Sequence, residues 1–331
     1  MDRRVFIGGL ALGTLAPAHV AHTQPGRKIY RIGILSAFTP TSEMVGPQPR
    51  SPSVNALLTG LRELGYVYGE HFVTEPRGGE GRPERFSSLA VELVRLQVDV
   101  IIAPGPMLHA LKQATATLPI VMAAAGDPVS GGVVQSLAHP GGNFTGFSLQ
   151  LLETTGKRLE LLKELVPRAT LVAVLFDRTS LANWQTTETA AKQRGWKLLS
   201  LEVADARQIE GAFKAASGAG ADALLVMASG VLDWHARRIV ELAARNRLPT
   251  MYELRPYVDA GGLISYSADL VDIWRRAAVF VDKIRRGAKP ADLPVEQPTK
   301  FELVVNLRTA RALGLAITQA LLSRADQVIE Q

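Results

Sequence analysis

The chain has 331 residues, of which 47% are hydrophobic and 21% charged, a balance typical of a globular protein with a sizeable core. It contains no cysteine, which excludes disulfides, thiolate metal sites and cysteine nucleophiles. The net charge of +6 is spread along the chain in pairs such as Arg237-Arg238 and Arg285-Arg286, without the clustered basic face that nucleic acid requires, so we expect no nucleic-acid partner.

The first 24 residues have the pattern of an export signal. Arg3 and Arg4 form a positive head, and an apolar run from Val5 to Ala16 is too short to cross a bilayer. We place cleavage between Ala18 and Gln24, and the arginine pair resembles a twin-arginine signal. The alternative, an amphipathic first helix, is disfavoured by three early glycines.

The rest of the sequence predicts a protein that works outside the cytoplasm without a membrane anchor. No later apolar run reaches membrane-spanning length, and the absence of cysteine removes a site for lipid attachment. We therefore expect a protein that diffuses freely in a bacterial periplasm, as a monomer.

After the signal, short β-branched runs alternate with longer stretches of helical period, the pattern of a parallel sheet wound with helices. A first helix is predicted to begin at Ser51-Pro52, with the serine as N-cap. The predicted strands are Ile29–Leu35, Val98–Ala103, Ile120–Ala124, Leu171–Phe176, Lys197–Leu201, Ala223–Met227 and Leu263–Tyr266. The other predicted helices are Phe86–Leu96, Leu108–Thr115, Leu159–Val166, Thr186–Arg194, Ile209–Ala216 and Arg237–Arg245.

This β/α unit occurs twice, which predicts two doubly wound parallel-sheet lobes of the α/β class. A Pro-Gly-Gly-Asn group at 140–143 marks a turn between them. A later apolar stripe, which includes Trp274 and Val281, needs a sheet to cover, so we expect the strand and helix around it to return to the first lobe. The predicted lobes are 27–147 plus 255–290 and 148–254 plus 291–331.

No motif in the sequence points to catalysis. Gly218–Ala223 imitates a dinucleotide fingerprint, but it follows a helix and precedes a strand, the reverse of the required order. Gly146–Gln150 lacks the second glycine of a nucleophile elbow. The histidines at 71, 109, 139 and 235 show no metal-ligand spacing. We expect no enzyme activity, cofactor or metal site, although distant loops can still assemble an active site.

The carboxyl ends of the predicted strands are the candidate binding region, because ligands of open parallel sheets lie there, near helix N-termini. Asp127, Asp177 and Ser180 are equally explained as helix caps. Phe38 and Tyr252 have an alternative as core side chains, but rings at the mouths of loops favour the cleft. The candidate ligand-binding residues at these ends are Ser36, Phe38, Gly105, Pro106, Gly126, Asp127, Asp177, Arg178, Thr179, Ser180, Ser229, Tyr252, Glu253 and Tyr266.

Two long stretches of this sequence resemble a known family. LKQATATLPIVMAAAGDPVSGGVVQSLAHPGGNFTGFS and AGGLISYSADLVDIWRRAAVFVDKIRRGAKPADLPVEQPTKFELVVNLRTARALGL closely resemble the exported substrate-binding proteins of ABC transporters often called tryptophan/tyrosine-type. The resemblance implies a type I periplasmic binding protein fold, with two lobes joined by three crossovers. It also implies a small solute held between the lobes and a membrane permease that receives the closed form.

The resemblance further implies which loops line the cleft. It adds Met107, Leu108 and Asp233 to the candidates, through the loops at 104–108, 126–128, 177–180 and 229–233. The turns DRTSLANW and ASGVLDW, together with Met107, depart from the usual family pattern at positions that touch the solute. An amino-acid-like or aromatic solute is implied, but its identity does not carry over.

From these observations we predict a solute-binding component of an ABC importer that closes on its ligand. The amides of Pro106 to Leu108, and hydroxyls such as that of Ser36, are expected to take the polar end of the solute. Arg178 suggests a carboxylate on the solute, unless it pairs with Asp177. Two alternatives remain: the same cleft feeding a sensor or receptor, and a periplasmic enzyme.

Overall fold

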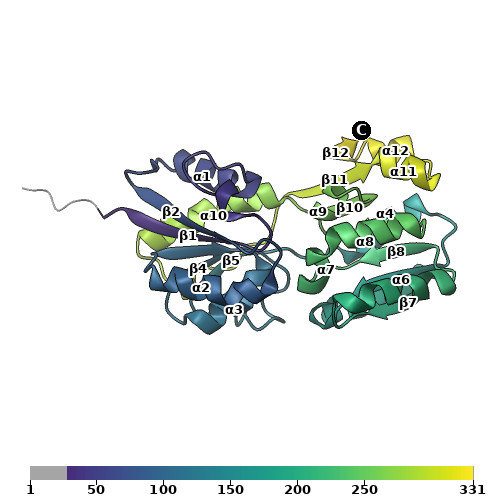
Figure 1. Cartoon of the computed structure of the whole chain (residues 1–331), viewed down its shortest axis with the longest axis horizontal. Helices are drawn as coiled ribbons and strands as arrows, with labels where there is room; N and C mark the ends of the chain where they lie inside the picture. Colours follow the sequence, from purple (N-terminus) through teal and green to yellow (C-terminus); the bar gives the residue numbers. More distant parts are fainter. Residues whose placement is uncertain (1–27, 331) are drawn as a thin grey trace, which may run out of the picture.

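The computed structural model describes residues 28–330, and the predicted export signal lies outside them. These residues form two α/β lobes side by side along the long axis of the molecule (Figure 1). The first lobe is built on a five-stranded sheet and the second on a seven-stranded sheet. The predicted fold class, two doubly wound lobes, is confirmed. No helix between residues 28 and 330 is long and apolar enough to cross a membrane.

The sheet of the first lobe is entirely parallel, in the order β2-β1-β3-β4-β5. Its strands are β1 (Tyr30–Ser36), β2 (Phe72–Gly78), β3 (Val100–Ala103), β4 (Ile120–Ala125) and β5 (Phe144–Ser148). Helices α1 (Pro52–Glu63) and α10 (Leu270–Arg285) cover one face, and α2 (Phe86–Arg95) and α3 (Leu108–Ala114) cover the other. Three of the five strands, β3, β4 and β5, are buried along their whole length, and β1 is buried at its centre, as a sheet covered on both faces requires.

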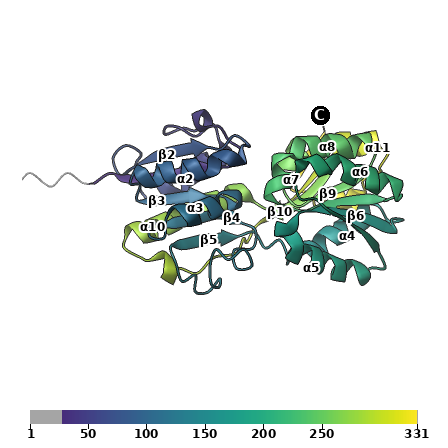
Figure 2. The ribbon, with the colours of Figure 1, turned by 60° about the horizontal axis from the view of Figure 1, so that its bottom comes forward.

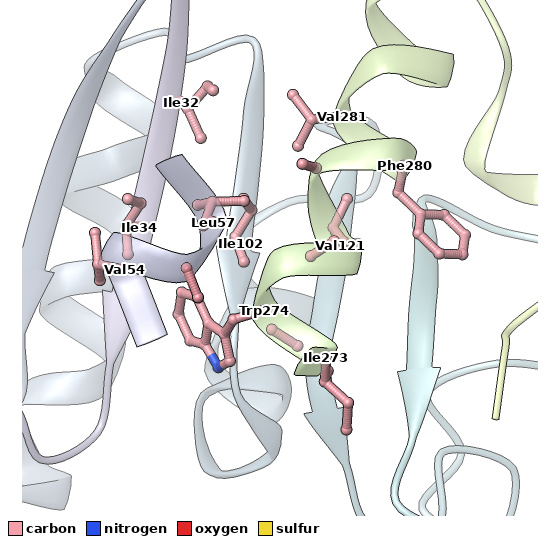
Figure 3. Packing of buried hydrophobic residues seen from close by; sticks show 14 of the residues in the cluster. Ile32, Ile34, Val54, Leu57, Ile102, Val121, Ile273, Trp274, Phe280 and Val281 are labelled. Atoms are coloured by element: carbon pink, nitrogen blue, oxygen red, sulfur yellow. The ribbon is translucent and has the colours of Figure 1, made fainter. Parts of the chain in front are cut away.

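The core between α1, α10 and the first sheet joins segments more than 200 residues apart in the sequence. Figure 3 shows Leu57 of α1 and Trp274 of α10 pointing into the same cluster as Ile34 of β1. The apolar stripe predicted around Trp274 and Val281 is therefore confirmed as a core face. Ser51 occupies the N-cap position of α1 as predicted, although its side chain makes no capping hydrogen bond.

The second sheet is parallel except that β11 runs antiparallel to β10, in the order β12-β11-β10-β9-β8-β6-β7. Its strands are β6 (Leu171–Phe176), β7 (Lys197–Glu202), β8 (Ala223–Val226), β9 (Thr250–Tyr252), β10 (Ile264–Ala268), β11 (Phe301–Asn306) and β12 (Gln327–Ile329). One face packs on α4 (Thr155–Leu165), α5 (Leu181–Lys192), α11 (Leu307–Leu313) and α12 (Gln319–Leu322). The other packs on α6 (Ile209–Gly218), α7 (Gly230–Trp234), α8 (Ala236–Arg245) and α9 (Pro256–Asp259).

Short 3-10 helices occupy several of the junctions between strands and helices. They are η1 (Thr41–Glu43), η2 (Pro83–Arg85), η3 (Gly105–Met107), η4 (Arg178–Ser180), η5 (Ala206–Gln208) and η6 (Pro290–Asp292).

Three crossovers join the lobes, from β5 to α4, from β10 to α10, and from the segment after η6 to β11. The first two leave from the carboxyl ends of β5 and β10. Since β4 runs parallel to β5 and β9 runs parallel to β10, the carboxyl ends of the parallel strands in both sheets lie at the edges that face each other. This is the region where the ligands of parallel sheets bind.

Two segments lie in the opposite lobe from the one predicted. β10 was expected in the first lobe, but it pairs with β9 and β11 in the second sheet, so only α10 returns. The segment after Ala291 was expected in the second lobe. The amide of Val295, however, donates to Leu137 O at 2.7 Å, and that of Glu296 to Gly146 O at 2.8 Å, both in the first lobe. An apolar run indicates that a strand is buried, but not which sheet accepts it.

Candidate functional site

The first-lobe loops offer less to a ligand than the sequence predicted. Ser36 ends β1, and its hydroxyl accepts a hydrogen bond from the Thr39 amide at 3.0 Å. Phe38 is 45% exposed, so its ring is not a core side chain. Among the candidates on these loops, Phe38 presents the largest apolar surface.

The turn after β3 does not supply the free amides that we predicted. Pro106 has no N–H, the Met107 amide donates to Pro104 O at 3.1 Å, and the Leu108 amide donates to Gly105 O. The side chains of Met107 and Leu108 are buried in the core beneath α2 and α3. The prediction that these amides take the polar end of the solute is therefore wrong, because the tight η3 turn already uses them.

Asp127, after β4, acts as a turn cap. Its Oδ1 accepts hydrogen bonds from the amides of Val129 at 3.1 Å and Ser130 at 3.2 Å. Gly126 before it is partly exposed. The capping alternative explains the position of this carboxylate, and Gly126 leaves backbone accessible beside it.

The turn after β6 in the second lobe is also tied to its own backbone. Asp177 Oδ1 accepts from Thr179 N at 2.8 Å, and Ser180 Oγ donates to Ala228 O at 2.8 Å. Arg178 is 89% exposed and pairs with Glu202 at 3.5 Å rather than with Asp177. The cap interpretation of Asp177 is confirmed. The suggested pairing of Arg178 with Asp177 is wrong, since their turn points the two side chains apart.

Glu253 lies at the end of β9 in a fully satisfied buried network. Its carboxylate accepts from Arg158 Nη1 at 3.0 Å, Asn183 Nδ2 at 2.7 Å and Ala228 N at 2.8 Å. Glu253 and Arg158 are each about 1% exposed. Arg158 also donates to Tyr266 O at 3.0 Å and to a carbonyl of the first crossover at 2.9 Å. Glu253 therefore joins α4, α5, β9 and the turn after β8, and its carboxylate is engaged by groups of the second lobe.

The sequence analysis missed Arg158, although its position gave a usable signal. Arg158, Leu162 and Leu165 follow the i, i+4, i+7 spacing of one helix face, and both leucines are core residues. A charged residue on the apolar face of a buried helix requires a charged or polar partner in the interior. That requirement predicts an acid such as Glu253.

Two stacked tyrosines lie behind the turn after β8. Tyr252 is buried, and its ring stacks on Tyr257 with centroids 4.8 Å apart. Tyr257 Oη donates to Asp233 Oδ1 at 2.9 Å. Burial raises the pKa of the Asp233 carboxyl to about 8, and the nearby carboxylates of Glu253 and Asp177 act in the same direction. Asp233 is therefore mostly protonated at pH 7, and Tyr252 is a core residue, as its alternative interpretation held.

The short helix α7 carries a contact between the lobes that the sequence analysis did not single out. Ser229 caps this helix through a hydrogen bond from Leu232 N at 3.2 Å. α7 lies on the side of the second lobe that faces the first (Figures 1 and 2). The ring of Trp234, its last residue, meets the ring of Phe86 at the start of α2 edge-to-face, with centroids 5.5 Å apart.

Two glycines make room for this ring contact. A Cβ atom on Gly79 would lie 2.4 Å from the Phe86 ring, and one on Gly230 would lie 3.3 Å from the Trp234 ring. The indole N–H of Trp234 is buried and has no hydrogen-bond partner among residues 28–330. The sequence signal for this residue was a tryptophan shortly after a strand end and the capping residue Ser229. Its partner, Phe86, lies in the other lobe and could not be read from the neighbouring sequence.

Tyr266 of β10 is partly buried and stacks on Phe301 of β11, with centroids 5.8 Å apart. Ser265 and Ser267 alternate with it and lie on the opposite face of the strand, where their hydroxyls are buried without partners among the described residues. The polar face of β10 was not predicted.

Two cavities occur elsewhere on the molecule. One of about 290 Å³, lined by Leu58, Arg62, Tyr66 and Phe72, lies beside α1 and β2. The other, of about 440 Å³, is an open depression along α5 near Gln185 and Thr189. Neither contains a predicted site residue.

The relationship of the chain to known proteins follows from a family comparison. The family model described as "ABC transporter substrate binding protein" matches residues 43–329. The chain belongs to this family. Its members bind small molecules outside the cytoplasm and work with the permease of an ABC transporter, so the chain is an ABC transporter substrate-binding protein, as predicted.

Individual relatives of this substrate-binding protein agree with the family and the fold. A tyrosine-binding protein from Clostridioides difficile is 24% identical over 278 residues, covering 83% of this chain and 80% of the relative. An ABC domain from Streptococcus pneumonia, solved in complex with L-Trp, superposes with a TM-score of 0.80 at 24% identity, covering 91% of this chain and all of that one. A conserved domain protein from Vibrio cholerae gives a TM-score of 0.79 at 24% identity, with the same coverage.

Proposed function

We propose that this protein is the solute-binding component of an ABC importer, and that it captures an amino-acid-like or aromatic solute between its lobes by closing on it. The observation that supports this most is the contact between Trp234 and Phe86, which brings loops from the carboxyl ends of the two sheets together. A solute bound among these loops touches both lobes. It therefore favours the arrangement in which they approach, because a ligand shifts an equilibrium by its difference in affinity between the two states.

The proposed solute class rests on aromatic side chains near the facing edges and on what the relatives bind. Phe38 is exposed, Tyr266 is partly buried and Trp234 lies between the lobes. One relative is named for tyrosine binding and another was solved with L-Trp. Most of the charged candidates are locked in caps or in the Glu253 network, which favours a solute bound mainly by ring burial and a few hydrogen bonds.

Native mass spectrometry of freshly purified protein, followed by a thermal-shift screen, tests this function. L-tryptophan or L-tyrosine at one hundred times its Kd should stabilise the protein by about 2.7 kcal/mol, and the D-enantiomer at the same concentration serves as control. The solute should be recovered chemically unchanged, which distinguishes binding from catalysis. The proposed class is refuted if neither amino acid raises the melting temperature while an unrelated solute does.

We also propose that the chain is exported and processed, and works as an unanchored monomer in the periplasm. The arginine pair and short apolar run support export, and the absence of cysteine removes a lipid attachment site. The intact mass of protein from a periplasmic fraction should correspond to cleavage between Ala18 and Gln24. Recovery of the unprocessed chain in the cytoplasm would refute this proposal.

A further inference from the structure

The indole N–H of Trp234 lacks an acceptor at the point where the lobes meet. Two buried indole N–H groups in the described part of the chain have no hydrogen-bond partner, those of Trp196 and Trp234. Trp196 lies in the core of the second lobe, whereas the ring of Trp234 packs against the first-lobe core. A buried donor without an acceptor destabilises the arrangement that buries it.

The surroundings of Trp234 restrict what kind of acceptor it takes. Its neighbour Asp233 already accepts a hydrogen bond from Tyr257, and Glu253 accepts hydrogen bonds from three other groups of the protein. The protein carboxylates nearest this turn in the network are thus engaged. An acceptor for Trp234 is therefore most simply supplied by a molecule that enters between the lobes.

The ring of Trp234 packs against Phe86 of the other lobe, and this contact orients its N–H. The edge of one ring meets the face of the other at an interplanar angle of 74°. Gly79 and Gly230 leave the space that both rings occupy. Since indole nitrogen is a donor only, this position selects an acceptor and disfavours an ammonium group.

We propose that Trp234 is a ligand-binding residue that joins the two lobes through the solute: its ring packs on Phe86, and its N–H donates to an acceptor oxygen of the bound molecule. This inference rests on the proposed function and deepens it. It assigns the end of the solute at α7 as a carboxylate or carbonyl oxygen attached to an apolar or aromatic body. The amino group of an amino acid must then lie elsewhere.

Isothermal titration of the full mature chain with L-tryptophan and with tryptamine, which lacks the carboxylate, tests the assignment. Trp234→Phe keeps a ring against Phe86 and removes the N–H. It should weaken L-tryptophan binding about tenfold, the loss expected for one hydrogen bond, and leave tryptamine binding nearly unchanged. Trp196→Phe is the matched control, because it removes the other unpartnered buried indole N–H, far from the lobe interface, and should change neither affinity.

Each outcome of the titration separates this inference from the proposed function. Unchanged L-tryptophan affinity in Trp234→Phe overturns the inference and leaves the function intact. An equal loss for both probes also overturns it, since ring packing and not the N–H would then be responsible. If the wild-type protein binds neither probe, the proposed ligand class fails by itself.

If the wild-type protein binds neither probe, a second measurement that needs no ligand tests the placement of Trp234. The chain has four tryptophans, so a ¹H–¹⁵N spectrum should contain four indole peaks, and Trp234→Phe identifies one of them. The Trp234 indole hydrogen should exchange with water more slowly in the wild type than in Phe86→Leu, which removes the opposing ring. Equal exchange rates in the two proteins would overturn the inference.

Discussion

Removal of Arg158 tests whether the network around Glu253 holds the ligand-facing edge of the second lobe together. Arg158 and Glu253 are both about 1% exposed, and burial lowers the pKa of the Arg158 guanidinium without neutralising it. In Arg158→Met the apolar stem is retained, but the carboxylate of Glu253 loses its only charged partner in the described network. It keeps two neutral donors, Asn183 Nδ2 and Ala228 N.

The expected loss in the free energy of unfolding is about 3–5 kcal/mol, the usual cost of breaking one side of a buried ion pair. The substitution also removes the donor to Tyr266 O and Leu151 O, so we expect a loss toward the upper end of this range. The double variant Arg158→Met/Glu253→Gln removes both charges. It should be more stable than Arg158→Met alone, since no uncompensated charge is left in the interior.

Urea unfolding followed by circular dichroism measures these differences, and a lobe that unfolds separately appears as its own transition. Arg275→Met is the control, because the Arg275–Glu63 pair is exposed and surface ion pairs contribute little to stability. A cost below about 1 kcal/mol for Arg158→Met, or a double variant less stable than both single variants, would show that this network does not act as a coupled pair.

Three further predictions concern protonation and close packing. Burial raises the pKa of Asp233 in the folded chain to about 8, above the unfolded value of about 3.9, so the folded state holds a proton between these pH values and stability falls as pH rises through them. Between pH 5 and pH 8.5 the free energy of unfolding, measured with urea, should fall by about 1 kcal/mol or more less in Asp233→Asn than in the wild type. If the free energies of unfolding of the two proteins change in parallel with pH, the prediction is wrong. Gly60→Ala should lower the free energy of unfolding by about 1–3 kcal/mol, because the new Cβ would lie 2.2 Å from Arg275 O. Gly211→Ala is the control: its new Cβ has nothing within 4 Å, so it should stabilise α6 by up to about 1 kcal/mol. Gly79→Ala should displace Phe86 and raise the exchange rate of the Trp234 indole hydrogen, and an unchanged rate would argue against the ring contact.

Several strands buried on both faces were predictable from sequence, and so was the edge strand β7, whereas the edge strand β2 was not. β3, β6 and β8 are continuous apolar runs because helices cover both of their faces. β2 was missed because it lies at a sheet edge and alternates polar with apolar residues, and it contains Pro76, which edge strands tolerate. β10 is placed by its pairing with β9 and β11, and no local pattern in its own residues records which sheet accepts it.

The candidate site was predictable as a set of loops but not as a set of roles. Polar residues such as Asp127 and Asp177 follow strands for two reasons, to cap the next turn and to bind ligands, and the two patterns are identical in sequence. Glu253 was predicted to bind a ligand because its partner Arg158 is 95 residues away in the sequence and the pairing could not be recognised. Trp234 was overlooked because its importance depends on Phe86 in the other lobe.

The central claim, closure of two lobes on a small solute, is tested most directly by the distance between spin labels on the two lobes. Because the chain has no cysteine, Gln113→Cys on α3 and Lys214→Cys on α6 provide two unique exposed labelling sites. Double electron–electron resonance should show a shorter and narrower distance distribution when saturating L-tryptophan or L-tyrosine, or the solute identified by native mass spectrometry, is added. An unchanged distribution with a bound solute would contradict the account.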